Sequence, residues 1–157
     1  MAKKYWLVKS EPSEYSFDDL TNEEDSIAEW DGVRNYQARN NMQAMKVGDE
    51  VLFYHSQTKP PAVVGLAEVV EEAYPDDTAW DPASEHPDPR STPDNPLWFM
   101  VDIQAKGKLQ RPVSLQEIRN TPGLEEMVLV KNSRLSVQPV TEEEWRIVLD
   151  MGARDEE

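Results

Sequence analysis

The sequence predicts an α+β fold: a mixed or antiparallel, partly closed β-barrel of about five or six strands, with short peripheral helices and a C-terminal helix. Runs of aromatic and β-branched residues are joined by turn signals, as in β-hairpins, and do not alternate with long helices as in a doubly wound sheet. Capping signals mark short helices between and after those runs. The 157 residues are most simply one domain (1–157) with its own core.

The first part of the chain predicts one strand and two helices. YWLVKS (5–10) is rich in aromatic and β-branched residues, which favour a strand. Ser16 and Asp19 have the spacing of a capping box, so a short helix is expected to begin there. After the turn signal Asp31-Gly32, residues 34–45 contain no helix breaker. Three apolar side chains of this segment recur at helical spacing and predict its buried face: Ala38, Met42 and Met45.

The middle of the chain predicts a hairpin followed by a long loop. Residues 47–56 indicate a turn and a strand, and residues 61–74 indicate a second, longer strand. Gly65 inside that strand suggests a bulge or a close approach of another group to the backbone. Residues 75–96 hold six prolines and no apolar periodicity. Long ordered loops in compact domains are more often functional than idle, so this loop is a candidate part of a site.

The last part of the chain predicts two strands, a short helix and a longer one. Residues 97–110 indicate a strand with a turn near Gly107, and residues 134–140 indicate the last strand. Ser114 and Glu117 form another capping box, for a short helix.

The C-terminal helix is expected to begin after Thr141, which forms a capping box with Glu144. Its inward face is predicted to carry Trp145, Val148 and Leu149. Residues 124–130 are ambiguous, although a helical turn fits three of them: Leu124, Met127 and Val128. Residues 152–157 are expected to form a disordered tail.

The chain is strongly acidic, with a formal net charge of −15. Residues 11–31 carry nine acids and no base, and residues 60–103 carry ten acids against a single arginine. Three segments are locally basic: 1–10 (+3), 32–59 (+2) and 104–139 (+3). These segments either converge into a phosphate-binding patch or form ordinary solvated faces, and both interpretations stay open.

The chain has no cysteine, which excludes disulfide bonds, zinc fingers and thiol nucleophiles and fits a reducing compartment. No apolar run is long enough for a signal peptide or a membrane span. We therefore expect a soluble, cytoplasmic protein that is monomeric and does not bind membranes. So acidic a composition suits either a halophilic source or simply a highly soluble protein.

Motifs of catalysis are absent from the sequence. It contains no nucleotide-binding glycine loop, no G-x-S-x-G and no H-E-x-x-H. A metal site built from His86 and its acidic neighbours is conceivable, but carboxylates in loops are usually only solvated; the set is Asp81, Glu85, His86 and Asp88. We expect no metal, no cofactor and no enzymatic activity.

The five tryptophans fall into two groups. Three lie on predicted strands or on a helix stripe and are expected to fill the core: Trp6, Trp98 and Trp145. Trp30 precedes a tight turn, and Trp80 lies in the proline-rich loop. Each of these two either anchors its loop or faces a ligand. Two indoles about 7 Å apart would sandwich a planar base, because each base that stacks on an aromatic ring contributes about 1–3 kcal/mol.

Six motifs follow one another along nearly the whole chain: YWLVKSEP (5–12), WDGVRNYQARN (30–40), VLFYHS (51–56), GLAEVVEEAYPD (65–76), WFMVDI (98–103) and RLSVQPV (134–140). In this order they resemble the EVE domain, and WDGVRNYQARN is the most diagnostic of them. The resemblance implies a PUA-like fold and kinship with YTH domains, which read methyladenine in RNA. It also implies binding of modified bases in DNA, methylcytosine and its oxidised forms among them.

The resemblance also implies site residues. Lys9 and Ser10 match the pair that borders the YTH pocket, and Trp30 matches the first cage tryptophan. Trp80 is the candidate for the second cage wall. Leu97 or Trp98 would close the third side, and Arg134 matches a basic position near the phosphates. The EVE motifs place further residues around the same pocket: Asn35, Tyr36, Arg39, Tyr54, His55 and Ser56.

The leading hypothesis is a non-enzymatic reader of a modified nucleobase or nucleotide, in DNA or RNA, with a flipped or single-stranded base in an aromatic cage. Ser10 and Asn35 would read the polar edge, and Arg39, His55 and Arg134 would hold the backbone. Two alternatives stay open. One is a small amidohydrolase-like enzyme for modified nucleosides that uses Lys9 with Glu11. The other is an acidic adaptor that binds a small anion or peptide.

Overall fold

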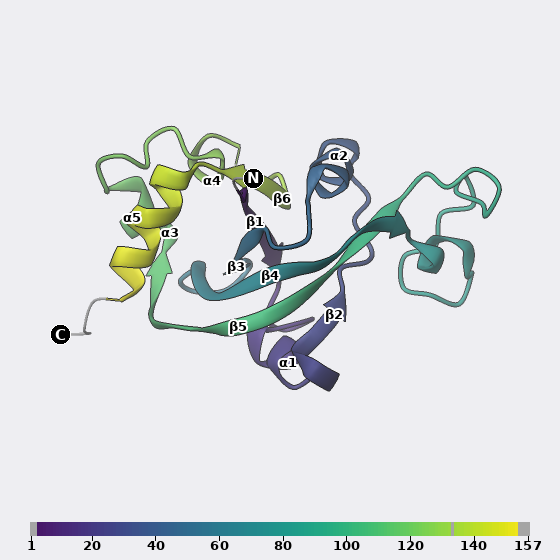
Figure 1. Ribbon diagram of the computed structural model, residues 1–157, viewed down its shortest axis with the longest axis horizontal. Coiled ribbons are helices and arrows are strands. Elements are labelled where there is room, and N and C mark those ends of the chain that lie inside the picture. Colours follow the sequence, from purple (N-terminus) through teal and green to yellow (C-terminus); the bar gives the residue numbers. More distant parts are fainter. Residues whose placement is uncertain (1–2, 133, 154–157) are drawn as a thin grey trace.

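The computed structural model describes residues 3–132 and 134–153. Its framework is one six-stranded sheet in the order β2-β5-β4-β3-β1-β6, shown in Figure 1. The elements, in chain order, are β1 (Tyr5–Ser10), α1 (Phe17–Thr21), the 3₁₀ turn η1 (Glu24–Ser26), β2 (Ile27–Glu29), α2 (Tyr36–Ala44), β3 (Glu50–His55), β4 (Ala62–Pro75), the 3₁₀ turn η2 (Asp77–Trp80), β5 (Phe99–Ser114), α3 (Leu115–Arg119), α4 (Val128–Lys131), β6 (Val137–Val140) and α5 (Glu142–Gly152).

The sheet is mixed, as the sequence predicts. β1 pairs in parallel with β3 and antiparallel with β6, whereas β3, β4 and β5 form successive antiparallel pairs. β4 and β5 are the long strands, and they curve across the molecule in Figure 1. Several shifts of register between β4 and β5 accompany this curvature, as β-bulges do in barrels. The α+β, barrel-like fold is therefore confirmed.

Both faces of the sheet are covered, and this explains why β1 and β3 are almost continuously apolar. Trp6, Val8 and Phe53 belong to one buried cluster, which also contains the apolar side chains of α1 and α2. Leu7 and Leu52 point to the opposite face and pack with α3, α4 and α5. Since side chains alternate between faces along a strand, one run of residues supplies both cores.

The helices begin where their capping signals lie. Side chains of Ser16, Ser114 and Thr141 each accept a hydrogen bond from the backbone of the third helical residue and complete the three predicted capping boxes. α2 starts at Tyr36, two residues later than expected, because the side chain of Asn35 caps it. Its predicted inward side chains are all buried: Ala38, Met42 and Met45.

Gly65 has both of the properties that the sequence suggests. The register of β4 against β5 shifts between Val63 and Gly65. A Cβ atom at Gly65 would lie 2.6 Å from the ring of Phe17. The missing side chain therefore lets α1 pack directly on the sheet.

Several predicted boundaries were wrong. β5 runs without a turn through Gly107, because β4 is long enough to pair with it as far as Ser114. β6 begins at Val137 and is shorter than expected. The three-residue strand β2, which pairs with β5 at the sheet edge, was not predicted at all. Within residues 124–130 the helix α4 begins only at Val128.

Toward the C-terminus, α5 buries Trp145 and Val148 as predicted, whereas Leu149 is only half-buried and Met151 completes the inward face. Gly152 is the buried last residue of α5, so the expected tail does not begin there. The rest of that prediction, for residues 154–157, lies outside the described residues.

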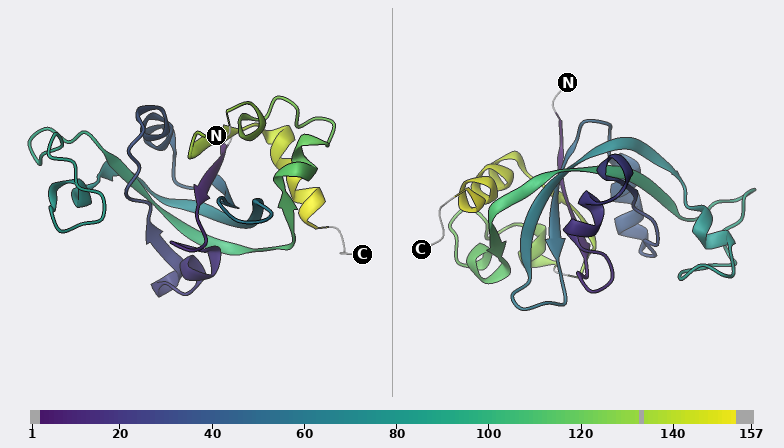
Figure 2. Two further views of the ribbon diagram at one scale, coloured as in Figure 1. Left: turned by 180° about the vertical axis from the view of Figure 1, so that it is seen from behind. Right: turned by 90° about the horizontal axis from the view of Figure 1, so that it is seen from below.

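The proline-rich loop of residues 75–96 leaves the sheet at the end opposite to α5. Figure 2 shows from two further sides that this loop projects beyond β4 and β5. Its only helical part in the described structure is η2. Across residues 3–132 and 134–153, no helix is long and apolar enough to cross a membrane.

Candidate functional site

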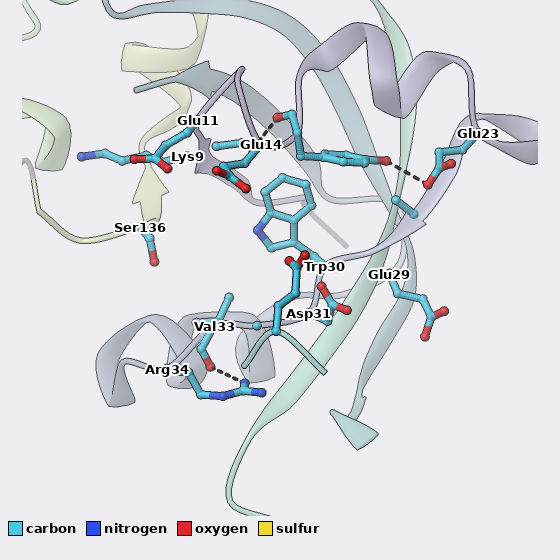
Figure 3. Close-up of a pocket in the computed structure, with 15 residues that line it drawn as sticks. Lys9, Glu11, Glu14, Glu23, Glu29, Trp30, Asp31, Val33, Arg34 and Ser136 are labelled. Atoms are coloured by element: carbon cyan, nitrogen blue, oxygen red, sulfur yellow. Dashed lines mark hydrogen bonds between the residues drawn. The ribbon is translucent and has the colours of Figure 1, made fainter. Parts of the chain in front are cut away.

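A cavity of about 620 Å³ opens beside the end of β1. Its walls come from residues between 9 and 15, from the segment 28–34 at the end of β2 and directly after it, and from three single side chains: Glu23, Glu85 and Ser136. Figure 3 shows Trp30 in the middle of these groups, with Lys9 and Ser136 on one side and Glu29 on the other. Segments that are distant in sequence therefore meet around one indole ring.

Trp30 is held by the strand that the sequence analysis missed. β2 pairs with β5, and the backbone N–H of Trp30 continues this pairing with a hydrogen bond of 2.7 Å to the carbonyl of Val101. Its ring makes edge-to-face contacts with Phe53 (5.5 Å between centroids) and Tyr15 (6.1 Å). Trp30 is half-buried, so one part of the indole packs on the core and another part lines the cavity.

Ser10 and Tyr15 hold together the part of the cavity wall that lies beside the end of β1. The Ser10 hydroxyl donates a hydrogen bond to the carbonyl oxygen of Tyr15, which ties the loop after β1 to the strand end. The Tyr15 hydroxyl donates to Glu23 at 3.1 Å. Burial is the main cause that raises the pKa of Tyr15, and Glu23 and nearby carboxylates raise it further. The phenol therefore stays neutral in a negative environment.

Asp76 is fully buried at the base of the proline-rich loop and joins that loop to the cavity wall. It accepts hydrogen bonds from the backbone N–H of Gly32 (2.8 Å), the guanidinium of Arg34 (3.0 Å) and the N–H and hydroxyl of Thr78. Burial alone would raise the pKa of Asp76, but these hydrogen bonds outweigh it and hold that pKa below its usual value. The carboxylate is therefore charged and paired.

His86 is the second point at which the loop meets the wall. Its carbonyl accepts two hydrogen bonds from Arg34, and its imidazole lies 3.9 Å from the carboxylate of Asp31. Gly32 has a φ of +77°, and a Cβ atom there would lie 2.8 Å from the His86 ring. Only glycine satisfies both conditions without strain. This contact brings the neighbouring Glu85 to the cavity.

Four side chains next to the cavity form a continuous stack. Arg39 lies over the ring of Tyr36 (5.0 Å), Tyr36 stacks on Trp98 (5.1 Å between centroids), and Arg34 lies over the Trp98 ring (5.6 Å). Arg39 also donates a hydrogen bond to the carbonyl of Leu97. Tyr36 and Arg39 therefore connect α2 to the segment just before β5, and the structure gives them a packing role.

Of the residues expected around a ligand, Lys9, Ser10 and Trp30 line this cavity. The other predicted site residues lie elsewhere. Asn35 caps α2 with its side-chain oxygen, and Tyr54 is buried among apolar side chains. His55 accepts a hydrogen bond of 3.0 Å from the backbone N–H of Phe17 and so positions α1.

Three more predicted site residues also stand apart from the cavity wall. Ser56 continues the pairing of β3 with β1 through its backbone N–H, which donates to the carbonyl of Ser10. Leu97 uses its backbone groups to bind Arg39 and Ser91. Arg134 is exposed, two residues before the wall residue Ser136.

The two-tryptophan sandwich is not formed in this structure. Trp80 belongs to η2, where its indole N–H donates a hydrogen bond to the hydroxyl of Ser91 at 3.3 Å. It is not among the residues that line the cavity with Trp30. The reason is the attachment of the loop through Asp76 and His86, which brings Glu85 and not Trp80 to the wall. In contrast, Trp6, Trp98 and Trp145 are buried as predicted.

No metal site is evident among the described residues, in which no three His, Asp or Glu side chains lie close enough to hold an ion. The proposed ligand His86 instead has Thr78 (3.0 Å) and Arg34 (3.3 Å) beside its Nδ1 atom.

Several wall residues were not predicted. Asp31 and Val33 lie inside the motif WDGVRNYQARN, and Glu14 and Tyr15 follow the predicted strand end, so adjacency to those motifs was an available signal. Ser136 likewise lies inside the motif RLSVQPV, whereas Glu85 carries no local signal for this cavity, because only the tertiary fold brings it to Trp30.

Comparison with known proteins gives consistent matches over nearly the whole chain. A family model described as the EVE domain matches residues 4–151. Thymocyte nuclear protein 1 of Mus musculus is 44% identical over 164 residues, which cover 94% of this chain and 73% of the mouse protein.

Two solved structures are similar throughout. A hypothetical protein from Leishmania major is 49% identical, with a TM-score of 0.91 and coverage of 96% of this chain and 95% of that chain. Human THYN1, crystallised in complex with DNA that contains 5-methylcytosine, is 41% identical, with a TM-score of 0.92 and coverage of 98% of this chain and 100% of that chain.

Proposed function

The chain belongs to the EVE-domain family, and on this premise we propose that it is a reader that binds a modified nucleobase of a nucleic acid in the cavity beside Trp30. One observation carries the proposal. A half-buried indole faces a cavity of about 620 Å³ in a chain 41% identical to a human protein crystallised with DNA that contains 5-methylcytosine. That volume lies within the range of small-ligand sites.

The reader needs one base outside the helical stack. A single-stranded or flipped base enters the cavity and packs its face on the exposed part of Trp30, which is worth about 1–3 kcal/mol. Val33 is a buried apolar wall residue, and contact with a buried methyl group adds about 0.8 kcal/mol. The hydroxyl of Ser10 donates to Tyr15, so it offers its free lone pairs to a donor on the base.

The nucleic acid backbone enters on the side of Lys9 and Ser136. Lys9 lines the cavity there, and Arg134 is an exposed cation two residues before Ser136. The opposite rim carries Glu23 and Glu29, which repel phosphate. Of the two interpretations of the basic segments, this proposal keeps only a narrow basic entry, which fits recognition of a single base with few phosphate contacts.

Hydrolysis of a modified nucleoside is the second candidate. Lys9 and Glu11 both line the cavity, and burial lowers the pKa of Lys9, as a general base requires. However, the Lys9 ammonium lies over the ring of Tyr54 at 5.6 Å and points away from Trp30 in Figure 3. Binding without turnover is therefore the favoured proposal. Release of product from acylated or alkylated cytidines by the intact chain but not by Lys9→Ala would reverse this preference.

Fluorescence anisotropy with short single-stranded oligonucleotides tests the reader. Strands of one sequence carry 5-methylcytosine, 5-hydroxymethylcytosine or unmodified cytosine at a central position, in DNA and in RNA. We expect at least one modified strand to bind more tightly than its unmodified counterpart. Equal affinity for every strand would show that the chain does not read base modification and would favour the adaptor hypothesis.

We also propose that this reader is a cytoplasmic monomer. The absence of cysteine fits a reducing compartment. Imaging of a fluorescent fusion and the elution volume in size-exclusion chromatography test the two statements. Exclusion of the fusion from the cytoplasm, or elution as a dimer, would contradict them.

A further inference from the structure

The wall around Trp30 is unusually acidic for a surface that meets nucleic acid. Among the described residues that line the cavity, six are carboxylates and two are cations. Five of the carboxylates belong to the acidic run 11–31: Glu11, Glu14, Glu23, Glu29 and Asp31. The sixth, Glu85, is brought to the same wall by the proline-rich loop.

Neither cation neutralises this wall. The Lys9 ammonium lies over Tyr54, and the Arg34 guanidinium pairs with buried Asp76 and the carbonyl of His86. Within the described part of the chain, Glu14 and Glu85 form no ion pair and accept no hydrogen bond through their side chains. Both carboxylates are exposed. The cavity therefore keeps a net negative field directly beside the indole.

Burial raises the pKa of two titratable groups at this wall. Burial, and then the nearby carboxylates, raise the pKa of Tyr15. Burial also raises the pKa of Asp31, and Asp76 adds to that rise against the opposing effects of His86 and Arg34. The neutral form of each group is therefore favoured, chiefly because of its burial.

The aromatic ring independently favours the same class of ligand. The face of an indole attracts cations more strongly than the rings of tyrosine or phenylalanine do. Trp30 is the one tryptophan that lines this cavity among the described residues. An aromatic surface beside an excess of carboxylates, with Glu14 and Glu85 unpaired, is the combination that recognises a flat, positively charged ring.

We propose that the cavity selects a base that carries a positive charge, such as cytosine methylated at ring nitrogen N3, over a neutral base of the same size. This inference rests on the proposed function and specifies its ligand class. The cationic ring gains cation–π attraction from Trp30 and Coulomb attraction from the carboxylates. Its exocyclic amine donates to a carboxylate, the pairing that acidic side chains make with cytosine N4. A neutral base gains only stacking and the amine contact.

A comparison of two isomeric nucleosides separates the effect of ligand charge on affinity from the effect of ligand size. 3-Methylcytidine is cationic at pH 7 and 5-methylcytidine is neutral, although both have the same ring and one methyl group. Each nucleoside is titrated calorimetrically at low salt, where attraction between charges is screened least. Because a nucleoside carries no phosphate, the acidic rim does not repel it. We expect the cationic isomer to bind at least about tenfold more tightly, which corresponds to about 1.4 kcal/mol. Added salt should reduce this ratio.

Matched variants test which carboxylates are responsible. Glu14→Gln and Glu85→Gln each remove one wall charge, and each should reduce the preference for 3-methylcytidine over 5-methylcytidine severalfold. Glu143→Gln makes the same change in net charge on the exposed surface of α5 and should leave the preference intact. Circular dichroism checks the fold of all three variants.

The outcomes distinguish the inference from the proposed function. Equal binding of the two isomers, or tighter binding of 5-methylcytidine, overturns the inference and leaves the reader standing. If both nucleosides bind too weakly to measure, the same two bases are compared in one single-stranded oligonucleotide. An oligonucleotide with 5-methylcytosine that binds at least as well as one with 3-methylcytosine again overturns the inference. Failure of every modified strand to bind refutes the proposed function as well.

Discussion

At the scale of the residue, Trp30 combines two tasks: it packs on Phe53 and Tyr15, and it lines the cavity. Trp30→Ala should weaken binding of a modified strand by about 1–3 kcal/mol, the contribution of one stacked base. Anisotropy titration measures this loss. Trp30→Phe keeps a ring and should retain most of the fold stability and part of the affinity.

Trp80→Ala is the matched control for this experiment, because Trp80 is also half-buried but bonds to Ser91 away from the cavity. It should bind with nearly unchanged affinity. If Trp80→Ala lost binding and Trp30→Ala kept it, the assignment of the site to this cavity would be wrong.

Gly32 allows the proline-rich loop to approach the wall closely, because it has no Cβ atom to meet His86. Gly32→Ala forces a side chain into a positive-φ conformation, which costs about 1–3 kcal/mol, and also pushes its Cβ to 2.8 Å from His86. Gly48→Ala shares the backbone strain, since Gly48 has a φ of +96°, but its Cβ would meet nothing within 4 Å. Urea unfolding of both variants should therefore show the larger loss for Gly32→Ala. Equal losses would mean that the His86 contact does not matter.

At the scale of the element, local signals predicted helices well and pairing between distant segments poorly. The capping boxes at Ser16, Ser114 and Thr141 involve residues three apart, so the sequence alone determines them. β2 has only three residues, and its partner β5 lies far along the chain, so neither length nor periodicity revealed it. The missed strand is the one that holds Trp30.

The residues of the candidate site show the same difference between local signals, which sequence reveals, and long-range contacts, which it does not. Lys9, Ser10 and Trp30 were predicted and lie at the cavity: Lys9 and Ser10 end the predicted first strand, and Trp30 directly precedes the predicted Asp31-Gly32 turn. Asn35, the first of the misplaced residues, resembles a base-reading amide but caps α2, a role that its position before the helix also favours. Glu85 was placed only in a doubtful metal site. Its position at the wall depends on contacts of Asp76 and His86 that no sequence pattern encodes.

α1 is fixed to the sheet by His55, whose neutral imidazole accepts the N–H of Phe17. Burial lowers the pKa of His55 below its unfolded value of 6.5, so the unfolded chain binds the proton more readily. The contribution of His55 to stability is thus present above about pH 6.5 and is lost as the pH falls below that value. Chemical unfolding between pH 5 and 7.5 should show a stability that declines on acidification. His55→Gln should make this part of the pH profile flatter; an unchanged slope would contradict the role of His55.

At the scale of the whole molecule, the net charge of −15 limits how much nucleic acid backbone the chain can hold. Most lysines of the described surface pair with acids, for example Lys108 with Asp18 and Lys131 with Glu126. Lys9 and Arg134 remain near the proposed entry.

Two phosphate contacts on a single strand predict a salt dependence of log K with a slope of about −1.4, since each contact contributes about −0.7. Arg134→Ala should roughly halve this slope. Anisotropy titrations at several salt concentrations measure both values, and a slope several times steeper would reveal a basic surface that this account does not contain.

The most direct test of the central claim follows the indole N–H signals of the five tryptophans by nuclear magnetic resonance during titration with a strand that contains one modified cytosine. Single Trp→Phe variants assign the signals. A base that stacks on Trp30 should shift the Trp30 signal most and leave the buried Trp6 and Trp145 signals in place. Binding that leaves Trp30 unmoved while another tryptophan shifts would contradict the claim that this cavity receives the base.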